Sequence, residues 1–214
     1  MKSRMVPLIA AAIAGLGLTT AQLFPNETAP FHLKLTSANA SLDGTYLYAC
    51  HSGAAIEQLC IGDKTPRPTS FDAYNLNYSE HSPVFDGNPS GQLVWKLPFN
   101  VNDTNGNAVT VYQPEPLNFF FSPTSNVAVL LFMPSDDAGV PLGFDGEQKM
   151  LVYNYVDDTV SPPNATGGYK AYYRWQACTT YFVGYTYQAL AWATSGTPVN
   201  PSCQPVNVTR EWLQ

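Results

Sequence analysis

The strongest constraint on the fold is how often residues that disfavour helices interrupt this chain. The sequence has 18 prolines and 15 glycines in 214 residues. Proline removes a backbone donor and clashes with the preceding helical turn. Prolines and β-branched or aromatic residues break almost every window long enough to show a 3.6-residue repeat. We therefore expect few helices.

Short segments with alternating apolar and polar residues recur instead, and this period places every second side chain on one face of a strand. Turn-forming pairs such as Asp43-Gly44, Asp86-Gly87, Asn105-Gly106 and Asp145-Gly146 separate them. This pattern predicts an all-β protein, a single antiparallel β-sandwich or barrel-like domain with about ten short strands. The candidate strands are residues 31–35, 45–49, 71–78, 92–97, 108–112, 117–121, 127–133, 150–155, 171–178, 185–193 and 206–212.

The N-terminus has the pattern of a secretory signal peptide. Lys2 and Arg4 precede an uncharged run from Met5 to Leu18, which is shorter than the roughly 20 residues that cross a bilayer. Small residues end at Ala21, where we expect cleavage. The alternative is an uncleaved membrane anchor. We predict a signal peptide over residues 1–21, a single secreted β-domain over residues 22–214, and no transmembrane segment in the mature protein.

Six N-glycosylation sequons support an extracellular protein. About two would be expected by chance from this composition, so six is an excess. Glycans at these positions would require exposed asparagines. The candidate sites are Asn26, Asn39, Asn77, Asn102, Asn164 and Asn207.

The four cysteines predict two disulfide bonds in an oxidising compartment. Three connectivities are possible. We favour Cys50 with Cys60 and Cys178 with Cys203, because each pair brackets a short, loop-prone segment between candidate strands. A zinc site would need a closer CxxC-type spacing, which is absent, so we expect no metal bound by these cysteines.

The segment RWQACTTYFVGYTYQALAW, residues 174–192, contains many aromatic side chains and one charge. Trp175 and Ala177 share a strand face with Tyr173, and Tyr185, Tyr187 and Ala189 share a face of the next strand, so the segment is first expected to pack in the core. The alternative is a partly exposed aromatic platform that binds sugars. Tyr181 and Phe182, in an expected loop before Gly184, are the candidate ligand-binding residues.

The C-terminal half carries a family resemblance. The pattern WxxCTTYxxGYxYxxLAW, followed by PVNPSC and VxVxR, resembles a signature of uncharacterised small secreted proteins of filamentous ascomycete fungi. The stretches FFFSPTSNVAVLLFMPSDDAGVPLGFD and KMLVYNYVDDTVSPP are also similar to that group, and the resemblance covers residues 118–210. It implies a secreted fungal protein, and it assigns no catalytic residue.

Histidine chemistry finds little support in the sequence. There is no Gly-x-Ser-x-Gly motif for a serine hydrolase. His32 lies in an alternating strand, His51 beside a cysteine and His81 in a polar loop, so no pattern groups them into a triad. A polysaccharide-cleaving copper oxidase would need a histidine at the mature N-terminus, where Gln22 is expected. We assign no catalytic residue and expect no cofactor.

Two readings of the acidic residues stay open. A glycoside hydrolase needs two carboxylates about 5 to 9.5 Å apart in a cleft. A calcium site could form from Asp136, Asp137, Asp145 and Glu147, although the spacing is not that of a helix-loop-helix calcium motif. The candidate hydrolase carboxylates are Glu57, Glu115, Asp145, Glu147 and the doublets Asp136-Asp137 and Asp157-Asp158.

The charge of the chain excludes one class of partner. The formal net charge is −6, and an acidic domain without a basic cluster repels nucleic acid. Two function classes remain. The first is a non-enzymatic extracellular or cell-wall-associated domain that binds polysaccharide or another glycan, and the second is a divergent carbohydrate-active hydrolase. The hydrolase needs a concave site where two carboxylates converge, and the binding domain needs an exposed aromatic surface.

Overall fold

The computed structural model describes residues 24–67, 69–135, 139–157 and 159–213, so the expected signal peptide lies outside the described residues. Nearly all of its regular structure is strand, which confirms the all-β prediction. None of the helices in this part of the chain has the length and apolar character to span a bilayer. The elements are β1 (Asn26–Glu27), β2 (Phe31–Thr36), β3 (Leu47–Gly53), β4 (Ile56–Ile61), α1 (Thr69–Asp72), β5 (Tyr74–Tyr78), β6 (Val84–Phe85), β7 (Asn88–Pro89), β8 (Gln92–Asn102), β9 (Ala108–Phe120), β10 (Val127–Phe132), β11 (Leu142–Phe144), β12 (Met150–Asn154), β13 (Lys170–Tyr172), β14 (Trp175–Phe182), β15 (Tyr185–Ala193), β16 (Gln204–Pro205) and β17 (Asn207–Trp212).

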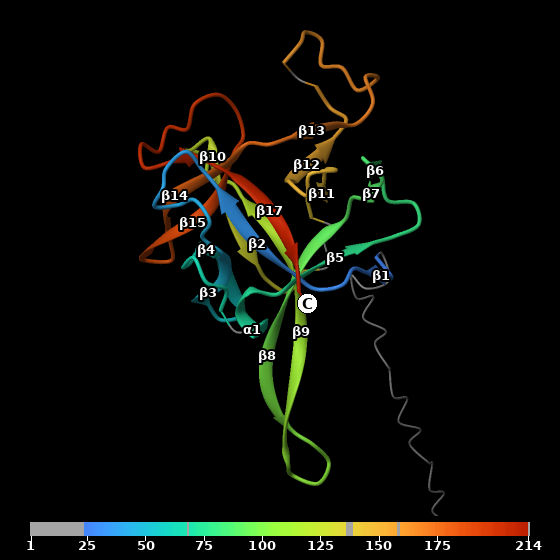
Figure 1. Cartoon of the computed structure of the whole chain (residues 1–214), viewed down its shortest axis with the longest axis vertical. Helices are drawn as coiled ribbons and strands as arrows, with labels where there is room; N and C mark the ends of the chain where they lie inside the picture. The colour runs from blue at the N-terminus through green and yellow to red at the C-terminus, as the bar shows by residue number, and fades with distance from the viewer. Residues whose placement is uncertain (1–23, 68, 136–138, 158, 214) are drawn as a thin grey trace, which may run out of the picture.

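Ten strands form an antiparallel, barrel-like sheet that is nearly closed (Figure 1). Their order is β16-β14-β15-β4-β10-β9-β8-β5-β2-β17, with β1 beside β5 and β3 beside β4. The two end strands, β16 and β17, are consecutive in the chain and are separated by Val206 alone. The Val206 N–H donates to the Trp175 carbonyl at 3.2 Å. The last strand segment therefore joins the two edges of the sheet, which leaves less free edge for association with other chains.

The inner face of this sheet carries the hydrophobic core. Phe31, Tyr74, Phe132 and Trp175 are each at most 1% exposed. The Tyr74 and Phe132 rings stack with centroids 5.6 Å apart. A smaller sheet, β11-β12-β13, connects to the barrel through the isolated bridges Gly91↔Leu142 and Lys149↔Thr209. Phe144 and Met150 of this small sheet belong to the same core cluster as the barrel strands.

Several predicted element boundaries were wrong. The residues between Cys50 and Cys60, expected to form a loop, contain most of β4, which pairs with β3, β10 and β15. The alternation is hidden there because Glu57 and Gln58 are polar yet buried. The predicted strands 108–112 and 117–121 are one continuous strand, β9, and the predicted strand 71–78 begins with the end of α1.

Both predicted disulfides are present in the structure. Cys50 joins Cys60 with a Cα–Cα distance of 5.8 Å, and Cys178 joins Cys203 with a Cα–Cα distance of 4.2 Å. The first bond connects the two strands of the β3–β4 hairpin, not the ends of a loop. The second ties β14 to the segment before β16, next to the closure of the sheet. Two disulfides are consistent with an extracellular or otherwise oxidising compartment.

We expect a non-reduced peptide map to recover one peptide pair containing Cys50 and Cys60 and another containing Cys178 and Cys203. The physical reason is the short Cα–Cα separation of each pair, since two cysteines more than about 7 Å apart cannot be bridged without movement of the backbone. Mass spectrometry before and after reduction measures the pairing. Recovery of a peptide linking Cys50 or Cys60 to Cys178 or Cys203 would contradict the register of β4.

Candidate functional site

The β14–β15 hairpin ends in an exposed tip rather than in the core. Val183 and Gly184 form its two-residue turn with φ values of 46° and 90°, and positive φ at both positions matches the right-handed twist of the two strands. Tyr181 and Tyr185, on either side of the turn, are each 69% exposed. The hairpin therefore presents aromatic side chains to solvent at one end of the barrel.

The candidate ligand-binding residues Tyr181 and Phe182 lie in the last part of β14, not in a loop. Tyr181 is opposite Thr186, and Phe182 is opposite Tyr185. Because neighbours along a strand point to opposite faces, these two residues do not form one platform. Phe182 is half-buried and packs edge-on against the exposed Phe120 ring at 5.8 Å.

A groove lies between this tip and the tip of the β3–β4 hairpin. Its volume is about 530 Å³, and it is lined by Val183, Tyr185, Thr186 and Tyr187 of one hairpin and by His51, Ser52 and Gly53 of the other. The hydroxyl of Ser52 donates to the Cys50 carbonyl at 3.2 Å, which fixes one wall of the groove. Aromatic rings beside hydroxyl and imidazole groups make a surface suited to an amphipathic ligand.

The sequence prediction placed Tyr185 and Tyr187 in the core with Ala189, and only Ala189 is buried there, at 1% exposure. The strand runs past the end of the barrel before its turn, so its first residues have no layer to pack against. The glycine of the Val183-Gly184 pair is the local sequence feature that indicates a tight turn, and hence a hairpin tip, at this position. Tyr173 was also misplaced, since it precedes β14 and is 40% exposed, whereas Trp175 and Ala177 are buried as expected.

Two of the candidate carboxylates meet behind the groove. Glu57 on β4 and Glu115 on β9 are 4% and 0% exposed. Burial, and then a hydrogen bond and charge repulsion from Glu57, raise the pKa of Glu115 to about 9. Among the described residues no donor from another part of the chain reaches either Glu115 oxygen to balance a negative charge, which also favours the protonated carboxyl. With a pKa of about 9, the Glu115 carboxyl is neutral near pH 7.

His51 connects this pair to the surface. Its Nδ1 lies 3.6 Å from Glu57 Oε1, and its side chain is 77% exposed. No sequence pattern groups His51 with Glu57 or Glu115, because the contact depends on the β3–β4 hairpin and on the β4–β10–β9 order of the sheet. His51, Glu57 and Glu115 therefore form a series of neighbouring ionisable groups that extends from the groove wall to the barrel interior.

The other candidate carboxylates that the structure describes, Asp145, Glu147 and Asp157, each have partners of their own. Asp145 Oδ1 accepts backbone hydrogen bonds from Glu147 and Lys149, and its Oδ2 accepts one from the Tyr173 hydroxyl at 2.9 Å. The Glu147 carboxylate pairs with Lys149. Asp157 pairs with Lys170 at 3.0 Å, and hydrogen bonds from Thr159 and Lys170 lower its pKa to about 2.

The calcium hypothesis concerns Asp136, Asp137, Asp145 and Glu147. Asp136, Asp137 and Asp158 lie outside the described residues. Within the ranges that are described, no three His, Cys, Asp or Glu side chains gather as ligands of a metal ion. The Asp145 oxygens already accept hydrogen bonds from the β11–β12 turn and Tyr173.

The remaining histidines have separate surroundings. His32 is 8% exposed, and its Nδ1 lies 3.0 Å from the Asp72 carbonyl oxygen and 3.3 Å from Asp72 Oδ1. His81 is exposed in the turn between β5 and β6. His32, His51 and His81 thus contact different neighbours, and the structure does not bring them together.

The six sequon asparagines are all at least partly accessible. Asn102, Asn164 and Asn207 are exposed, and Asn26, Asn39 and Asn77 are half-buried. Asn102 ends β8 at the tip of a long hairpin, and Asn164 lies in the segment between β12 and β13. None of them lines the groove between the two hairpin tips.

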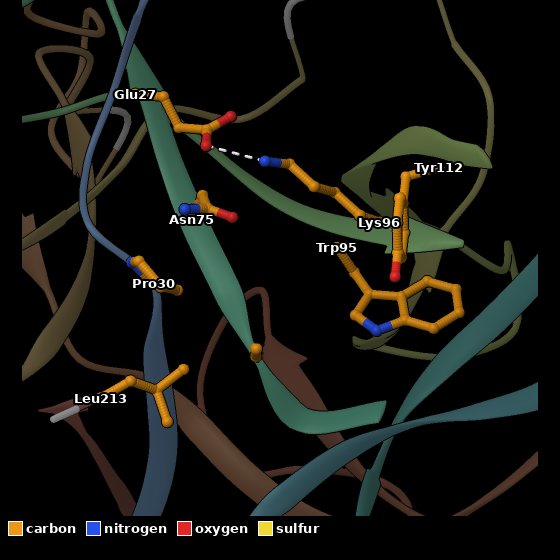
Figure 2. Close-up of a pocket in the computed structure, with 8 residues that line it drawn as sticks. Glu27, Pro30, Asn75, Trp95, Lys96, Tyr112 and Leu213 are labelled. Carbon is orange, nitrogen blue, oxygen red and sulfur yellow. Dashed lines mark hydrogen bonds and ion pairs between the residues drawn. The ribbon is translucent and has the colours of Figure 1, made fainter. Parts of the chain in front are cut away.

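A second concavity, of about 500 Å³, lies where β5 separates from β8 (Figure 2). In Figure 2 the Lys96 ammonium reaches the Glu27 carboxylate at 2.7 Å, and the Tyr112 ring lies on the same side of the view as Lys96, away from Pro30 and Leu213. Asn75 is 6% exposed, and its amide donates to the Thr28 carbonyl. This concavity contains an internal ion pair, whereas the first groove is lined by two tyrosines and, of the residues that form ion pairs in the described part of the chain, by His51 alone.

Comparisons with known proteins give a family without a known activity. No curated protein and no solved structure matches this chain significantly. One family model matches residues 28–212, which is nearly all of the described barrel and its small sheet. The chain therefore belongs to the family described as domain of unknown function (DUF7907).

Proposed function

We propose that this protein is a secreted, N-glycosylated, non-enzymatic domain, residues 22–214, that is associated with the cell wall or another extracellular surface and binds glycan. The groove between the β3–β4 and β14–β15 hairpin tips carries the proposal. There, exposed tyrosine rings and polar side chains share one concave surface with a volume of about 530 Å³, sufficient for a short sugar chain.

The chemistry of the groove suits a neutral sugar. A pyranose has an apolar C–H face that packs on an aromatic ring, and its hydroxyl groups need donors and acceptors at the edge of that ring. Tyr185 supplies the most exposed ring, at 69%. His51, on the facing β3–β4 hairpin, supplies a polar group beside it. An acidic protein with net charge −6 favours such a neutral ligand over a polyanion.

Extracellular placement rests on the two disulfides, on the signal-peptide pattern and on the six accessible sequons. Glycans at Asn102, Asn164 and Asn207 would leave the groove open, because none of these residues lines it. A fungal source is proposed from the resemblance of residues 118–210 to secreted ascomycete proteins.

We expect the double substitution Tyr185→Ala/Tyr187→Ala to abolish retention on insoluble fungal cell-wall polysaccharide or to weaken it at least tenfold. Loss of two aromatic contacts at about 0.5 to 1.5 kcal/mol each, plus lost buried area, accounts for this size. Pull-down isotherms on washed wall material, compared with soluble-sugar competition, measure the effect. Thermal melting should change little, because the tip lies outside the core.

Two controls separate this groove from other aromatic surfaces. Tyr112→Ala removes the ring of the second concavity and should leave retention unchanged. Tyr181→Ala/Phe182→Ala removes the residues first expected to bind, and it should have a smaller effect than the groove variant because neither residue lines the groove. Equal retention of the groove variant and the parent protein would refute the proposed site.

A hydrolase is the second candidate, and the convergence of Glu57 and Glu115 favours it. The two carboxyls are enclosed in the barrel, however, and a substrate bond must reach both of them. Of the three ionisable groups His51, Glu57 and Glu115, His51 lines the groove, and it lies 3.6 Å from Glu57. Release of reducing sugar from wall glycans by the parent protein, lost in Glu57→Gln and in Glu115→Gln, would favour the hydrolase over the binding domain.

A further inference from the structure

Three tyrosines share one face at the end of the small sheet β11-β12-β13. Tyr153 lies in β12, Tyr155 follows that strand, and Tyr169 directly precedes β13. Tyr153 is opposite Ala171 in the β12–β13 ladder. Because side chains two residues apart in a strand point to the same face, Tyr155 and Tyr169 lie on the face of Tyr153. The two strands therefore bring phenol rings together that are far apart in the sequence.

The closest contact is between the rings of Tyr153 and Tyr169. Their centroids are 4.8 Å apart and their planes differ by 18°. Tyr155 meets Tyr169 edge-on, at 5.3 Å and 65°. Among the described residues, no other ring contact joins two tyrosines. Near-parallel rings at such a separation are stacked with an offset, so carbon atoms of the two rings are in van der Waals contact, at about 3.5 to 4.0 Å.

Contacts around the pair hold the two rings in place. The Phe85 ring packs against Tyr153 with centroids 5.5 Å apart. On the other side, Lys170, the neighbour of Tyr169, pairs with Asp157 at 3.0 Å. Groups that are already in contact react as if one were present at a very high concentration around the other. The pair is thus arranged for a reaction between its own rings.

The two rings differ in their access to solvent. Tyr169 is 46% exposed and Tyr153 only 8%. An external oxidant can therefore take an electron from Tyr169, while Tyr153 is shielded from other molecules. All four cysteines are in disulfides, and Met150 of β12 is 0% exposed. A radical on the Tyr169 ring consequently meets the Tyr153 ring, and no free thiol among the described residues competes for it.

We propose that Tyr153 and Tyr169 are a site of oxidative cross-linking, at which a carbon–carbon bond joins the two rings. The oxidant is a peroxidase that takes single electrons from phenols and reduces hydrogen peroxide. Each phenol loses one electron and its hydroxyl proton, which gives two phenoxyl radicals. The radicals couple through ring carbons next to the oxygen-bearing carbons, and the hydrogen on each coupled carbon moves to the phenolic oxygen. The tyrosines lose two hydrogen atoms in total, and one hydrogen peroxide takes them up to give two waters.

The ring contact explains how both electrons leave the pair. The peroxidase reaches the exposed ring of Tyr169, and the stacked contact passes the radical on to Tyr153. Tyr169 is then oxidised a second time, and the two radicals couple. The new bond closes the segment between β12 and β13 into a loop, as a disulfide would, and so restricts the unfolded chain.

The test is oxidation of the full mature protein by a haem peroxidase with equimolar hydrogen peroxide, at about 1 μM protein to limit reactions between copies. Trypsin releases residues 150–170 as one peptide, because no lysine or arginine lies between Lys149 and Lys170. We expect mass spectrometry to show that this peptide, freed of any glycan on Asn164, has lost two hydrogen atoms. A second cleavage before Asp157 should leave its two halves joined.

Single substitutions identify the two rings that react. Tyr153→Phe and Tyr169→Phe should each abolish the joined peptide, because phenylalanine keeps the ring but has no hydroxyl to oxidise. Tyr155→Phe is the matched control. It removes a phenol of the same face that is 45% exposed and touches Tyr169, and it should give the joined peptide in the yield of the parent protein. Circular dichroism of each variant checks that the barrel is folded.

Three results would overturn the proposal. The first is an unchanged mass of the tryptic peptide after oxidation, and the second is loss of the joined peptide in Tyr155→Phe. The third is cross-linked tyrosine found only in covalent dimers, as expected if the exposed Tyr181 and Tyr185 react between copies. None of Tyr153, Tyr155 and Tyr169 lines the groove, so glycan retention should be the same in all variants, and this test is independent of the proposed function.

Discussion

Trp175→Ala is expected to lower the free energy of unfolding by about 3 to 5 kcal/mol. Trp175 is 1% exposed, and its ring lies 4.7 Å from that of Trp192 and 6.2 Å from that of Phe119. Its indole N–H also donates to the Met150 carbonyl at 2.7 Å, so the substitution leaves a buried acceptor without its partner. Urea denaturation followed by circular dichroism measures the change.

The matched control is Tyr181→Ala in the same strand, β14. Tyr181 is 69% exposed, so its removal should change the free energy of unfolding by less than about 0.5 kcal/mol. A domain has only about 5 to 15 kcal/mol of stability, so Trp175→Ala threatens folding itself. If it fails to accumulate, Trp175→Phe provides a milder test, with a smaller loss. Comparable stability of Trp175→Ala and Tyr181→Ala would show that Trp175 is not part of the core.

Glu115→Gln is expected to stabilise the protein at alkaline pH and to flatten the dependence of its stability on pH. The folded state holds the Glu115 proton up to a pKa of about 9, because the carboxyl is buried beside Glu57. In the unfolded chain the same carboxyl loses its proton near the ordinary pKa of a glutamate, 4.5. Between these values the folded state binds more protons, so the free energy of unfolding falls as pH rises.

The variant carries an amide of nearly the same shape, which can donate to Glu57 at every pH and needs no proton. At pH 8 we expect it to be more stable than the parent by about 3 kcal/mol, within the bound of 1.36 kcal/mol per pKa unit. At pH 4.5 the two should be similar. Denaturant titrations of both proteins at half-unit pH intervals measure the difference in their free energies of unfolding. The contributions of the other titrating groups are the same in both proteins and cancel in this difference.

Glu80→Gln serves as the control, because Glu80 is exposed in the turn after β5. It should follow the pH curve of the parent protein. If the free energy of unfolding depends on pH in the same way for Glu115→Gln and the parent, Glu115 is ionised in the folded protein at neutral pH. The assignment of a protonated Glu115 would then be wrong.

Local chemistry in the sequence determined a large part of this protein. Turn pairs such as Asp86-Gly87 and Asn105-Gly106 have positive φ at glycine, where other residues are strained. Alternation marked most of the strands, and the spacing of the cysteines led to both disulfides. These features depend on residues close together in the chain, so pattern reasoning could find them.

The tertiary structure alone decided what those strands do. β4 was not visible because Glu57 and Gln58 carry polar groups, and their burial depends on β9 and β10, far along the chain. Tyr185 and Trp175 share one aromatic segment, yet one is 69% exposed and the other 1%. Which residues are covered depends on where each strand passes the end of the barrel, and that is a property of strand order and register, which short-range patterns do not encode.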